Sequence, residues 1–400
     1  MARVLTNLGT YGATKAFYDG PIGQAIVDAV QSRGGSLNMD DLRNHRSEFP
    51  EAIKTRYRGA DIWEHPPNGQ GLAALIALAI LNKIEPCKLS GSPSSRLHVL
   101  IECMRLAFAD ARKFISDPSV DSKHKTETFR TLLSEEYIKK RRNLIDMSRA
   151  NSDVVRNLIS MYEVGVRSAR TSLTLSLSLT HTHTYTFVSL CSTHSTHTHT
   201  QVAGTPIASS DTVSFQVVDR DGNAVSMVNS NYMGFGTGIV PKECGFTLQN
   251  RGHNFSLDPM HWNCFAPNKR PYHTIIPGMA TYADDGSLYA TFTNMGGFMQ
   301  PQGHLQLMSN MLDFKMCPQR SIDLPRFCIA DGTSNGLISL EEGISKKCVE
   351  KLKKLGHNVK IVRGHDRSVF GRAQIITRDR KSGVLCGGSD CRADGMAAGL

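Results

Sequence analysis

Apolar side chains recur at helical spacing through the first part of the chain. Ile22 to Val30 follows the pattern of an amphipathic helix, and Met39 to Leu42 begins another after polar residues. Leu72 to Leu81 is apolar on all sides, which predicts a buried helix. A longer apolar stripe from Leu97 to Phe108 predicts a helix that ends near Pro118, because proline cannot continue one. We therefore expect a mainly helical first part.

A different pattern, with a period of two, follows Thr212. Apolar residues alternate there with more polar ones, as in strands that bury one face. Asp-Gly at residues 221–222 lies between the two alternating runs and predicts a hairpin turn, since glycine tolerates positive φ. A second hairpin is expected near the C-terminus, so the later part of the chain should consist mainly of strands. The alternating residues are Phe215, Val217, Val225 and Met227, and the later strands are 372–376 and 384–386.

Thr212, at the mouth of the first predicted hairpin, has two interpretations. A threonine that opens a strand is usually only a β-branched residue that suits the pleated sheet. If the chain were cut before Thr212, however, the hydroxyl and a freed α-amine would belong to one residue. That amine has an ordinary pKa of about 7.7–8.0, so it could act as the general base that activates the hydroxyl. The hairpin alone favours the first interpretation.

Several motifs, which follow one another in a fixed order along the chain, favour the second. Together they resemble the γ-glutamyltransferase family of N-terminal nucleophile hydrolases, which cleave themselves before a threonine. The resemblance covers Leu5 to Asp153 and Val202 to the C-terminus. The matching segments are residues 17–22, 57–59, 66–71, 217–226, 234–241, 269–274, 295–298 and 388–395.

The resemblance implies a role for residues in these motifs. Thr212 corresponds to the nucleophile, Asp211 to the residue before the cut, and Ser230 to a second hydroxyl that is hydrogen-bonded to the nucleophile. Asn231 is expected to bind substrate beside Ser230. The pair Gly296–Gly297 corresponds to the glycines whose N–H groups form the oxyanion hole, where a side chain would obstruct the approach of backbone to substrate.

The sequence departs from the glutathione-binding members in two places. Those members hold the γ-glutamyl amino group with paired acids, but the corresponding residues here are His253 and Asn254. Paired serines of those members correspond to Tyr272 and His273, which we expect among the substrate-binding residues. The same segments resemble the divergent branch of the family, which includes oxamate amidohydrolase.

Two arginines in these segments are candidates for binding a substrate carboxylate. An arginine grips a carboxylate through two parallel hydrogen bonds. We favour Arg251 over Arg270 for this role. The alternative for each is a surface arginine that packs its aliphatic stem against the protein and keeps its charge in water.

Residues 171–201 form a low-complexity segment of Leu-Ser and Thr-His repeats. Repeated CT and AC dinucleotides in DNA encode these pairs, so we interpret the segment as translated repeat sequence, from a retained intron or a mispredicted exon. Polar repeats bury too little apolar area to fold, and we expect a disordered insert at residues 164–201. The rival interpretation is a metal site at His181 and His183, since His-rich tracts can bind metal.

The predicted fold class is α+β, with the four-layer αββα sandwich of N-terminal nucleophile hydrolases. The family's large subunit extends upstream of the segment that matches Leu5, so we expect the sandwich to be incomplete at its N-terminus. Two regions flank the insert. They are a mainly helical, partial large-subunit region at 1–163 and a small-subunit region, mainly of strands, at 202–400.

Composition narrows the classes of function. With 40% hydrophobic and 20% charged residues, the chain is typical of soluble globular proteins, and no stretch is apolar enough to span a membrane. The net charge of +10 is dispersed, and its densest run, Lys346 to Lys354, predicts a solvated helix face. We therefore expect no nucleic-acid partner. Ten cysteines without a Cys-x-x-Cys motif favour free thiols in the cytoplasm.

These observations predict an autoprocessed threonine amidohydrolase or acyltransferase that acts on small carboxylate-bearing amides. No metal or organic cofactor is implied, and a homodimer of processed subunits is compatible with the resemblance. One alternative is a true glutathione hydrolase. The other is an inactive fragment or binding scaffold, because the upstream region that completes the family's site is expected to be missing.

Overall fold

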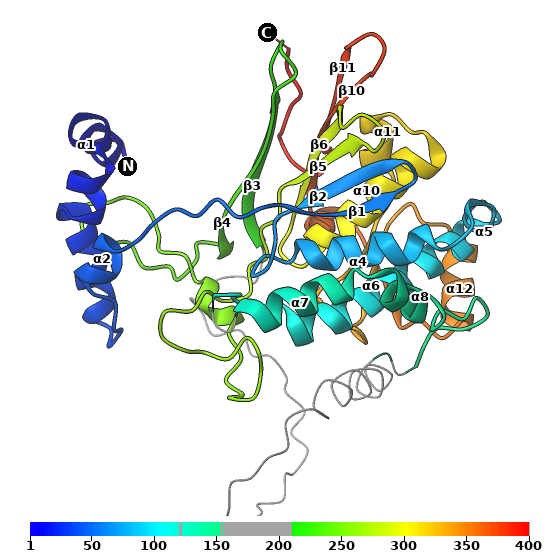
Figure 1. Ribbon diagram of the computed structural model, residues 1–400, viewed down its shortest axis with the longest axis horizontal. Helices are drawn as coiled ribbons and strands as arrows, with labels where there is room; N and C mark the ends of the chain where they lie inside the picture. Colours follow the sequence, from blue (N-terminus) through cyan, green and yellow to red (C-terminus); the bar gives the residue numbers. More distant parts are fainter. Residues whose placement is uncertain (120–121, 153, 155–209, 400) are drawn as a thin grey trace, which may run out of the picture.

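One sheet of six strands is built from the first and the last parts of the chain (Figure 1). The structure is a computed structural model, and it describes residues 1–119, 122–152, 154 and 210–399. Neighbouring strands are antiparallel throughout, in the order β1-β2-β5-β6-β10-β11. The strands are β1 (Ile53–Tyr57), β2 (Ala60–Glu64), β5 (Gly278–Tyr282), β6 (Leu288–Met295), β10 (Arg372–Arg378) and β11 (Leu385–Ser389).

Helices cover one face of this sheet and bury its apolar side chains. α4 (Gly71–Asn82) packs on β1 and β2, and α10 (Met299–Phe314) packs on β6. All α4 residues up to Leu81 are buried, which confirms the predicted buried helix. α6 (Pro93–Phe114) packs against α4 and ends before Pro118, as expected. The smaller helices beside them are α5 (Pro86–Ser90), α7 (Ser122–Leu132), α8 (Glu135–Arg142) and α11 (Pro318–Asp323).

A smaller sheet lies beside this helical layer. It contains β7 (Phe327–Ile329), β8 (Ile338–Glu341) and β9 (Val359–Val362), and β8 pairs with β9 in parallel. The crossover between those two strands is α12 (Lys346–Lys354), which buries Val349 and Leu352 and turns its lysines outward. The predicted lysine-rich helix is therefore confirmed. Gly356, at a φ of +95°, follows its end.

The predicted hairpin, β3 (Ser210–Val218) and β4 (Ala224–Met233), packs against the other face of the large sheet. Its polar residues face inward: Gln216 Nε2 donates to Thr293 Oγ1 at 3.2 Å, and Ser226 Oγ donates to the Phe292 carbonyl at 3.2 Å. The alternating pattern is confirmed, but the apolar residues expected on the buried face lie on the exposed one. Phe215, Val217, Val225 and Met227 are 48%, 50%, 54% and 45% exposed.

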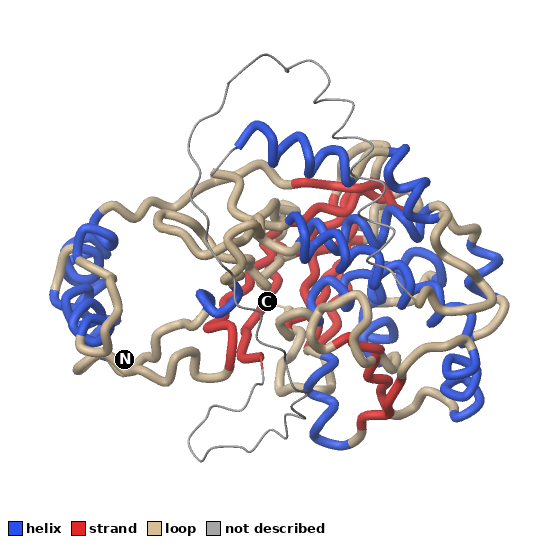
Figure 2. The backbone as a smooth tube through the Cα atoms, turned by 90° about the horizontal axis from the view of Figure 1, so that it is seen from below, coloured by secondary structure: helices blue, strands red, loops and turns tan. Residues whose placement is uncertain are grey.

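The N-terminal helices lie apart from the sheet and its helical layer in both views (Figure 1, Figure 2). They bury a small cluster of their own against the loop that contains Cys244 and Phe246. The predicted amphipathic helix is α2, and Asn38 caps α3 by accepting hydrogen bonds from two backbone N–H groups. The elements are α1 (Ala2–Ala13), the π-helix Thr14–Tyr18, α2 (Pro21–Gln31) and α3 (Met39–Arg43).

The regions on either side of the expected insert are not separate folding units, because β2 from the first pairs with β5 from the second. The first region also contributes strands, and the second contributes α10, α11 and α12. This mixture of helix and sheet confirms the α+β class. The expected insert at 164–201, and with it the rival metal site at His181 and His183, falls outside the described residues.

Candidate active site

Thr212 lies between the hairpin and the large sheet, near the start of β3. Its side chain is buried, and its Oγ1 donates a hydrogen bond to Ser230 Oγ at 2.9 Å. The two residues are paired across β3 and β4. The backbone N–H of Tyr232 also donates to Ser230 Oγ, at 2.9 Å. The structure thus brings together the two hydroxyl groups that the sequence predicted to interact.

The peptide bond before Thr212 lies at an irregularity of the hairpin. The register of β3 and β4 shifts between Asp211 and Thr212, so a β-bulge interrupts the ladder there. Opposite the bulge, Tyr232 adopts a φ of +79°, which is unfavourable for a bulky side chain. Bulges re-aim side chains and are common beside active sites. This one distorts the backbone at the expected cleavage site.

Gly296 and Gly297 connect the end of β6 to the start of α10. Their φ values are +134° and +62°, which L side chains rarely adopt. A Cβ on Gly296 would also lie 3.1 Å from the Cα of Gly371. Among the turn and loop hydrogen bonds of the described residues, none is donated by the backbone N–H of Gly296 or of Gly297. Two donors at such a turn are suited to stabilising an oxyanion.

Gln70 supports this turn from behind, a role that the sequence analysis missed. Its Nε2 donates to the carbonyl oxygens of Gly297 at 2.8 Å and Thr274 at 2.6 Å. Tyr272 donates its hydroxyl to Gln70 Oε1 at 3.2 Å. Burial raises the pKa of Tyr272, so its hydroxyl stays protonated. Tyr272 therefore supports the site through Gln70, whose only sequence signal was its place in the motif at 66–71.

Arg251 reaches the site from the 3₁₀ turn Arg251–Asn254 that follows β4. Its guanidinium donates to the carbonyl oxygen of Ser230 at 3.0 Å and to Thr274 Oγ1 at 3.1 Å. The residue is only 4% exposed, and burial lowers its pKa. No carboxylate of the described residues forms an ion pair with it. A buried cation that contacts only neutral groups is suited to binding an anionic ligand.

The other predicted binding residues have structural partners. Arg270 forms a bidentate ion pair with Glu48, at 2.6 and 2.5 Å. Asn231 Nδ2 donates to Thr247 Oγ1 at 3.1 Å. Burial lowers the pKa of His273 to about 4, and its Nδ1 lies 2.9 Å from the side-chain amide of Asn68. The neutral His273 therefore helps to hold the loop that carries Gln70.

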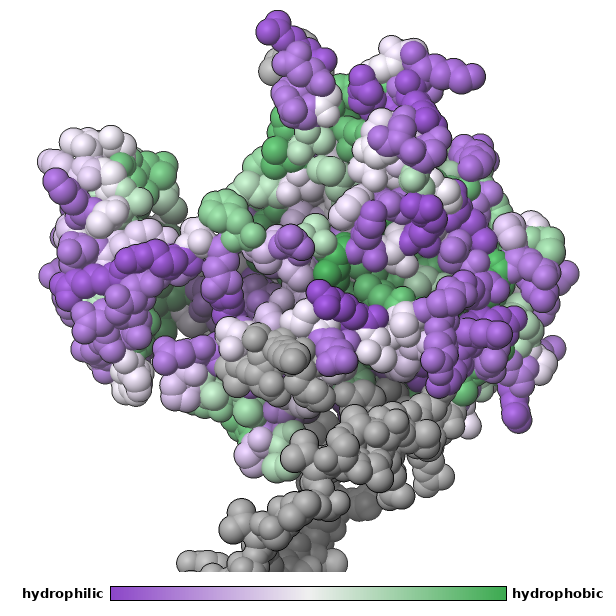
Figure 3. Space-filling view, viewed as in Figure 1, coloured by the Kyte–Doolittle hydropathy of each residue, from purple (hydrophilic) through white to green (hydrophobic). Residues whose placement is uncertain are grey.

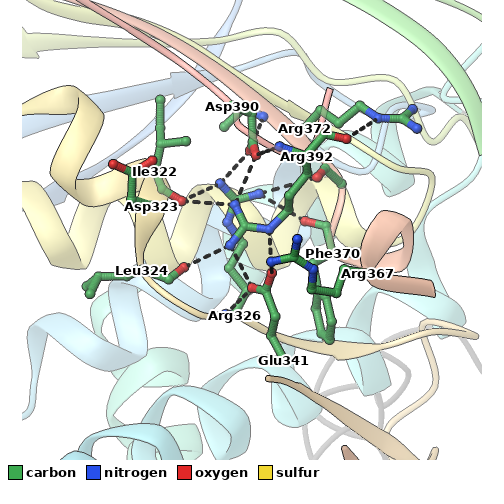
Figure 4. A network of polar contacts seen from close by, with 12 residues as sticks. Ile322, Asp323, Leu324, Arg326, Glu341, Arg367, Phe370, Arg372, Asp390 and Arg392 are labelled. Atoms are coloured by element: carbon green, nitrogen blue, oxygen red, sulfur yellow. Dashed lines mark hydrogen bonds and ion pairs between the residues drawn. The ribbon is translucent and has the colours of Figure 1, made fainter. Parts of the chain in front are cut away.

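A cavity of about 820 Å³ opens beside Thr212, and residues from β10 and the C-terminal turn at 391–395 line its wall. A buried cluster of charges holds this wall in place (Figure 4). Arg326 Nη2 donates to Asp390 at 2.7 Å and its Nη1 to Asn294 of β6 at 2.8 Å. Arg392 pairs with Glu341 at 2.6 Å and with Asp390 at 2.9 Å. Burial alone would raise the pKa of Asp390, but the two arginines bring it below its ordinary value.

Comparison with known proteins agrees with this geometry. The sequence profile of the family described as Gamma-glutamyltranspeptidase matches residues 1–400. The chain belongs to this family. Its members are N-terminal nucleophile hydrolases and transferases, made as proenzymes that process themselves.

Relatives of this γ-glutamyltranspeptidase-family chain include enzymes with different names. The glutathione hydrolase-like YwrD proenzyme of Bacillus subtilis (strain 168) is 30% identical over 98% of this chain and 64% of its own length. The oxamate amidohydrolase proenzyme of Klebsiella pneumoniae is 28% identical over 96% of this chain and 62% of its own. The chain thus spans less than two thirds of each of these relatives.

Among solved structures, cephalosporin acylase from Bacillus halodurans is similar, with a TM-score of 0.77 and 35% identity. The match covers 99% of this chain and 61% of the acylase. It confirms the N-terminal nucleophile hydrolase fold. Within the described residues, no helix is long and apolar enough to cross a membrane, and no three His, Cys, Asp or Glu side chains are grouped as a metal site requires.

Proposed function

We propose that the protein is an autoprocessed threonine amidohydrolase or acyltransferase that acts on small amides bearing a carboxylate. Membership of the family supports the reaction type. The observation that supports the substrate class is Arg251, a buried guanidinium without an ion-pair partner among the described residues. Arg251 donates to the carbonyl oxygen of Ser230, and the hydroxyl of Ser230 accepts the hydrogen bond of Thr212.

The first step of this proposal is self-cleavage at the bulge. Thr212 Oγ1 attacks the carbonyl carbon of Asp211, the C–N bond breaks, and the acyl group passes to oxygen as an ester. The nitrogen takes up a proton and becomes the α-amine of Thr212. Water then hydrolyses the ester, and the chain is left in two pieces. Ser230 accepts the hydrogen bond of the attacking hydroxyl and so orients it.

Turnover uses the same groups. The α-amine accepts the proton of the hydroxyl as oxygen attacks the substrate amide, and an ordinary pKa of about 7.7–8.0 suits that role. The N–H groups of Gly296 and Gly297 stabilise the negative oxygen that forms. The protonated amine then donates its proton to the leaving nitrogen. Water, or an acceptor amine, cleaves the resulting ester and restores the hydroxyl.

Two residues favour an acyl group that carries a carboxylate but no ammonium group over a γ-glutamyl group, which carries both. His253 is exposed, and Asn254 donates its side-chain amide to the Tyr272 carbonyl at 3.1 Å. Neither residue carries a carboxylate that could bind the ammonium group of glutamyl. Arg251 could bind a terminal carboxylate through two parallel hydrogen bonds.

The test compares glutaryl and γ-glutamyl para-nitroanilides, with oxamate as a third substrate. We expect a higher kcat/KM for the glutaryl anilide. Arg251→Gln should lower that value by roughly 10- to 100-fold, since a hydrogen bond to a charged group contributes about 1.5–3 kcal/mol. Arg270→Gln is the matched control, because Arg270 is already paired with Glu48. A preference for γ-glutamyl would support glutathione hydrolysis instead, and an uncut protein without activity would support the scaffold alternative.

A further inference from the structure

The cavity beside Thr212 contains an arginine that the proposed mechanism does not use. Three arginines line the wall: Arg367, Arg372 and Arg392. Arg367 pairs with Glu342 at 3.1 Å, and Arg392 pairs with Glu341 and Asp390. Arg372 differs, because no described carboxylate forms an ion pair with it. Its contacts are the Arg392 carbonyl, at 3.3 Å from Nε, and the Met295 sulfur, at 3.6 Å from Nη1.

Arg372 is placed beside the candidate oxyanion hole by the register of the sheet. It pairs with Met295 across β10 and β6, and Met295 directly precedes Gly296. The preceding residue, Gly371, packs against Gly296. Figure 4 shows the guanidinium of Arg372 at the edge of the charged cluster, directed away from Glu341 and Asp390. The cation is thus half-buried and available on the cavity side of the site.

Arg251 and Arg372 approach Thr212 from different elements. Arg251 contacts the hairpin through the Ser230 carbonyl and does not line the cavity, whereas Arg372 and Thr212 both line it. An amide extends in two directions from its carbonyl carbon. If the acyl group lies toward Arg251, the amine lies in the cavity. The cavity is open to solvent and large enough for a bulky amine, and water can enter there once that amine has left.

We propose that Arg372 forms an anion-binding subsite for the leaving group of the substrate. The preferred substrates would then carry two anionic groups, one on the acyl side and one on the amine side, as in an N-acylated amino acid with an acidic acyl group. This inference rests on the proposed function for the orientation of the amide. Asp394, which lies at the exposed edge of the cavity, would disfavour a second negative charge on the amine.

The first test measures binding without catalysis. The probes are para-nitroaniline and its ring-carboxylated analogue, aminonitrobenzoate, titrated against the full chain by difference absorbance. We expect aminonitrobenzoate to bind about tenfold more tightly, and Arg372→Gln to remove this difference while Arg372→Lys keeps part of it. Arg380→Gln is the matched control, because Arg380 lies outside the cavity and pairs with Asp284. Equal binding of the two probes by the wild-type chain would overturn the proposal.

The second test measures specificity with glutaryl anilides of the same two amines. We expect the ratio of kcat/KM, carboxylated over neutral, to be about ten in the wild type and about one in Arg372→Gln. Hydrolysis with a ratio that does not depend on Arg372 would refute the subsite and leave the proposed function intact. Probe binding that depends on Arg372, without hydrolysis of either anilide, would support the subsite and contradict the proposed function. If Arg372→Gln does not fold, Arg372→Met keeps the aliphatic stem against Met295 and replaces it.

Discussion

The large sheet and the hairpin that carries Thr212 bury opposite kinds of side chain. The sheet directs apolar residues such as Phe292 and Ile375 toward the helices, and these residues are fully buried. The hairpin directs its polar residues inward and leaves its apolar residues in water, where Figure 3 shows hydrophobic colour over β3 and β4. In both regions apolar and polar residues alternate with a period of two, but the sheet has its apolar face covered and the hairpin its polar face.

This difference separates stability from chemistry within one fold. The helix-facing side of the sheet is mostly apolar, apart from the buried Glu64–His304 pair, so it supplies hydrophobic stabilisation. Its other side carries Thr291 and Thr293, which meet Gln216 of the hairpin. A two-stranded hairpin alone is marginally stable, so these polar contacts hold the strand that carries Thr212 in place. Reacting groups need such a polar environment, so the inner face of the hairpin is the face suited to the proposed chemistry.

The largest effect should come from the hairpin's inner face. Thr212→Ala removes the hydroxyl, so we expect no fragment that begins at residue 212 and a loss of amide hydrolysis of at least about 10³-fold. Thr212→Ser should retain some cutting, since it loses only the methyl group that restricts χ1. Intact-protein mass spectrometry and a chromogenic amide measure the two. Hydrolysis by a wild-type chain that shows no such fragment would contradict the mechanism.

The next largest effect should come from the sheet's apolar face. Phe292→Ala leaves a cavity between β6 and α10, where the ring now packs at 4.8 Å from that of His304. We expect a loss of about 3–5 kcal/mol in the free energy of unfolding, measured by urea denaturation. Under the same conditions, a loss below 1 kcal/mol would show that the helix-covered face does not dominate stability.

A smaller effect should follow pH, through a buried histidine pair between α6 and the turn that follows α12. His98 Nδ1 lies 2.7 Å from His357 Nε2, and burial lowers the pKa of His357 to about 3. The unfolded chain binds a proton below pH 6.5, whereas the folded chain does not until about pH 3. The contribution of the neutral His357 to the free energy of unfolding is therefore complete above pH 6.5, and it falls by roughly 2 kcal/mol by pH 5. In urea titrations at several pH values, His357→Gln should weaken the fall in the free energy of unfolding between pH 6.5 and pH 5. An unchanged fall would show that His357 is not its source.

The smallest effect should come from the hairpin's outer face. Phe215 is 48% exposed, so Phe215→Ser should change the free energy of unfolding by no more than about 0.5 kcal/mol. Phe292→Ala, in the same assay, provides the contrast. If Phe215→Ser instead cost more than about 2 kcal/mol, the outer face would be covered in solution and the comparison would break down.

Much of the fold could be predicted because the signals are local. The apolar run at 72–81 and the stripe at 97–108 predict helices, and Asp-Gly at 221–222 predicts a turn, whatever surrounds them. The candidate nucleophile, its neighbouring hydroxyl and the candidate glycine pair were likewise predicted from short motifs. Their positions in one site then required only that the family's fold be formed.

The tertiary structure decided what depends on neighbours distant in sequence. The alternating pattern determined that β3 and β4 have two unlike faces, but only packing against β6 and β10 decided which face is buried. Arg251 and Arg270 look alike in sequence. One remains without an ion-pair partner in the described chain, and the other pairs with Glu48, 222 residues away. Gln70 supports Gly297 across 227 residues. The periodicity of a sequence determines local geometry, whereas charge pairing and burial depend on which surfaces meet in the fold.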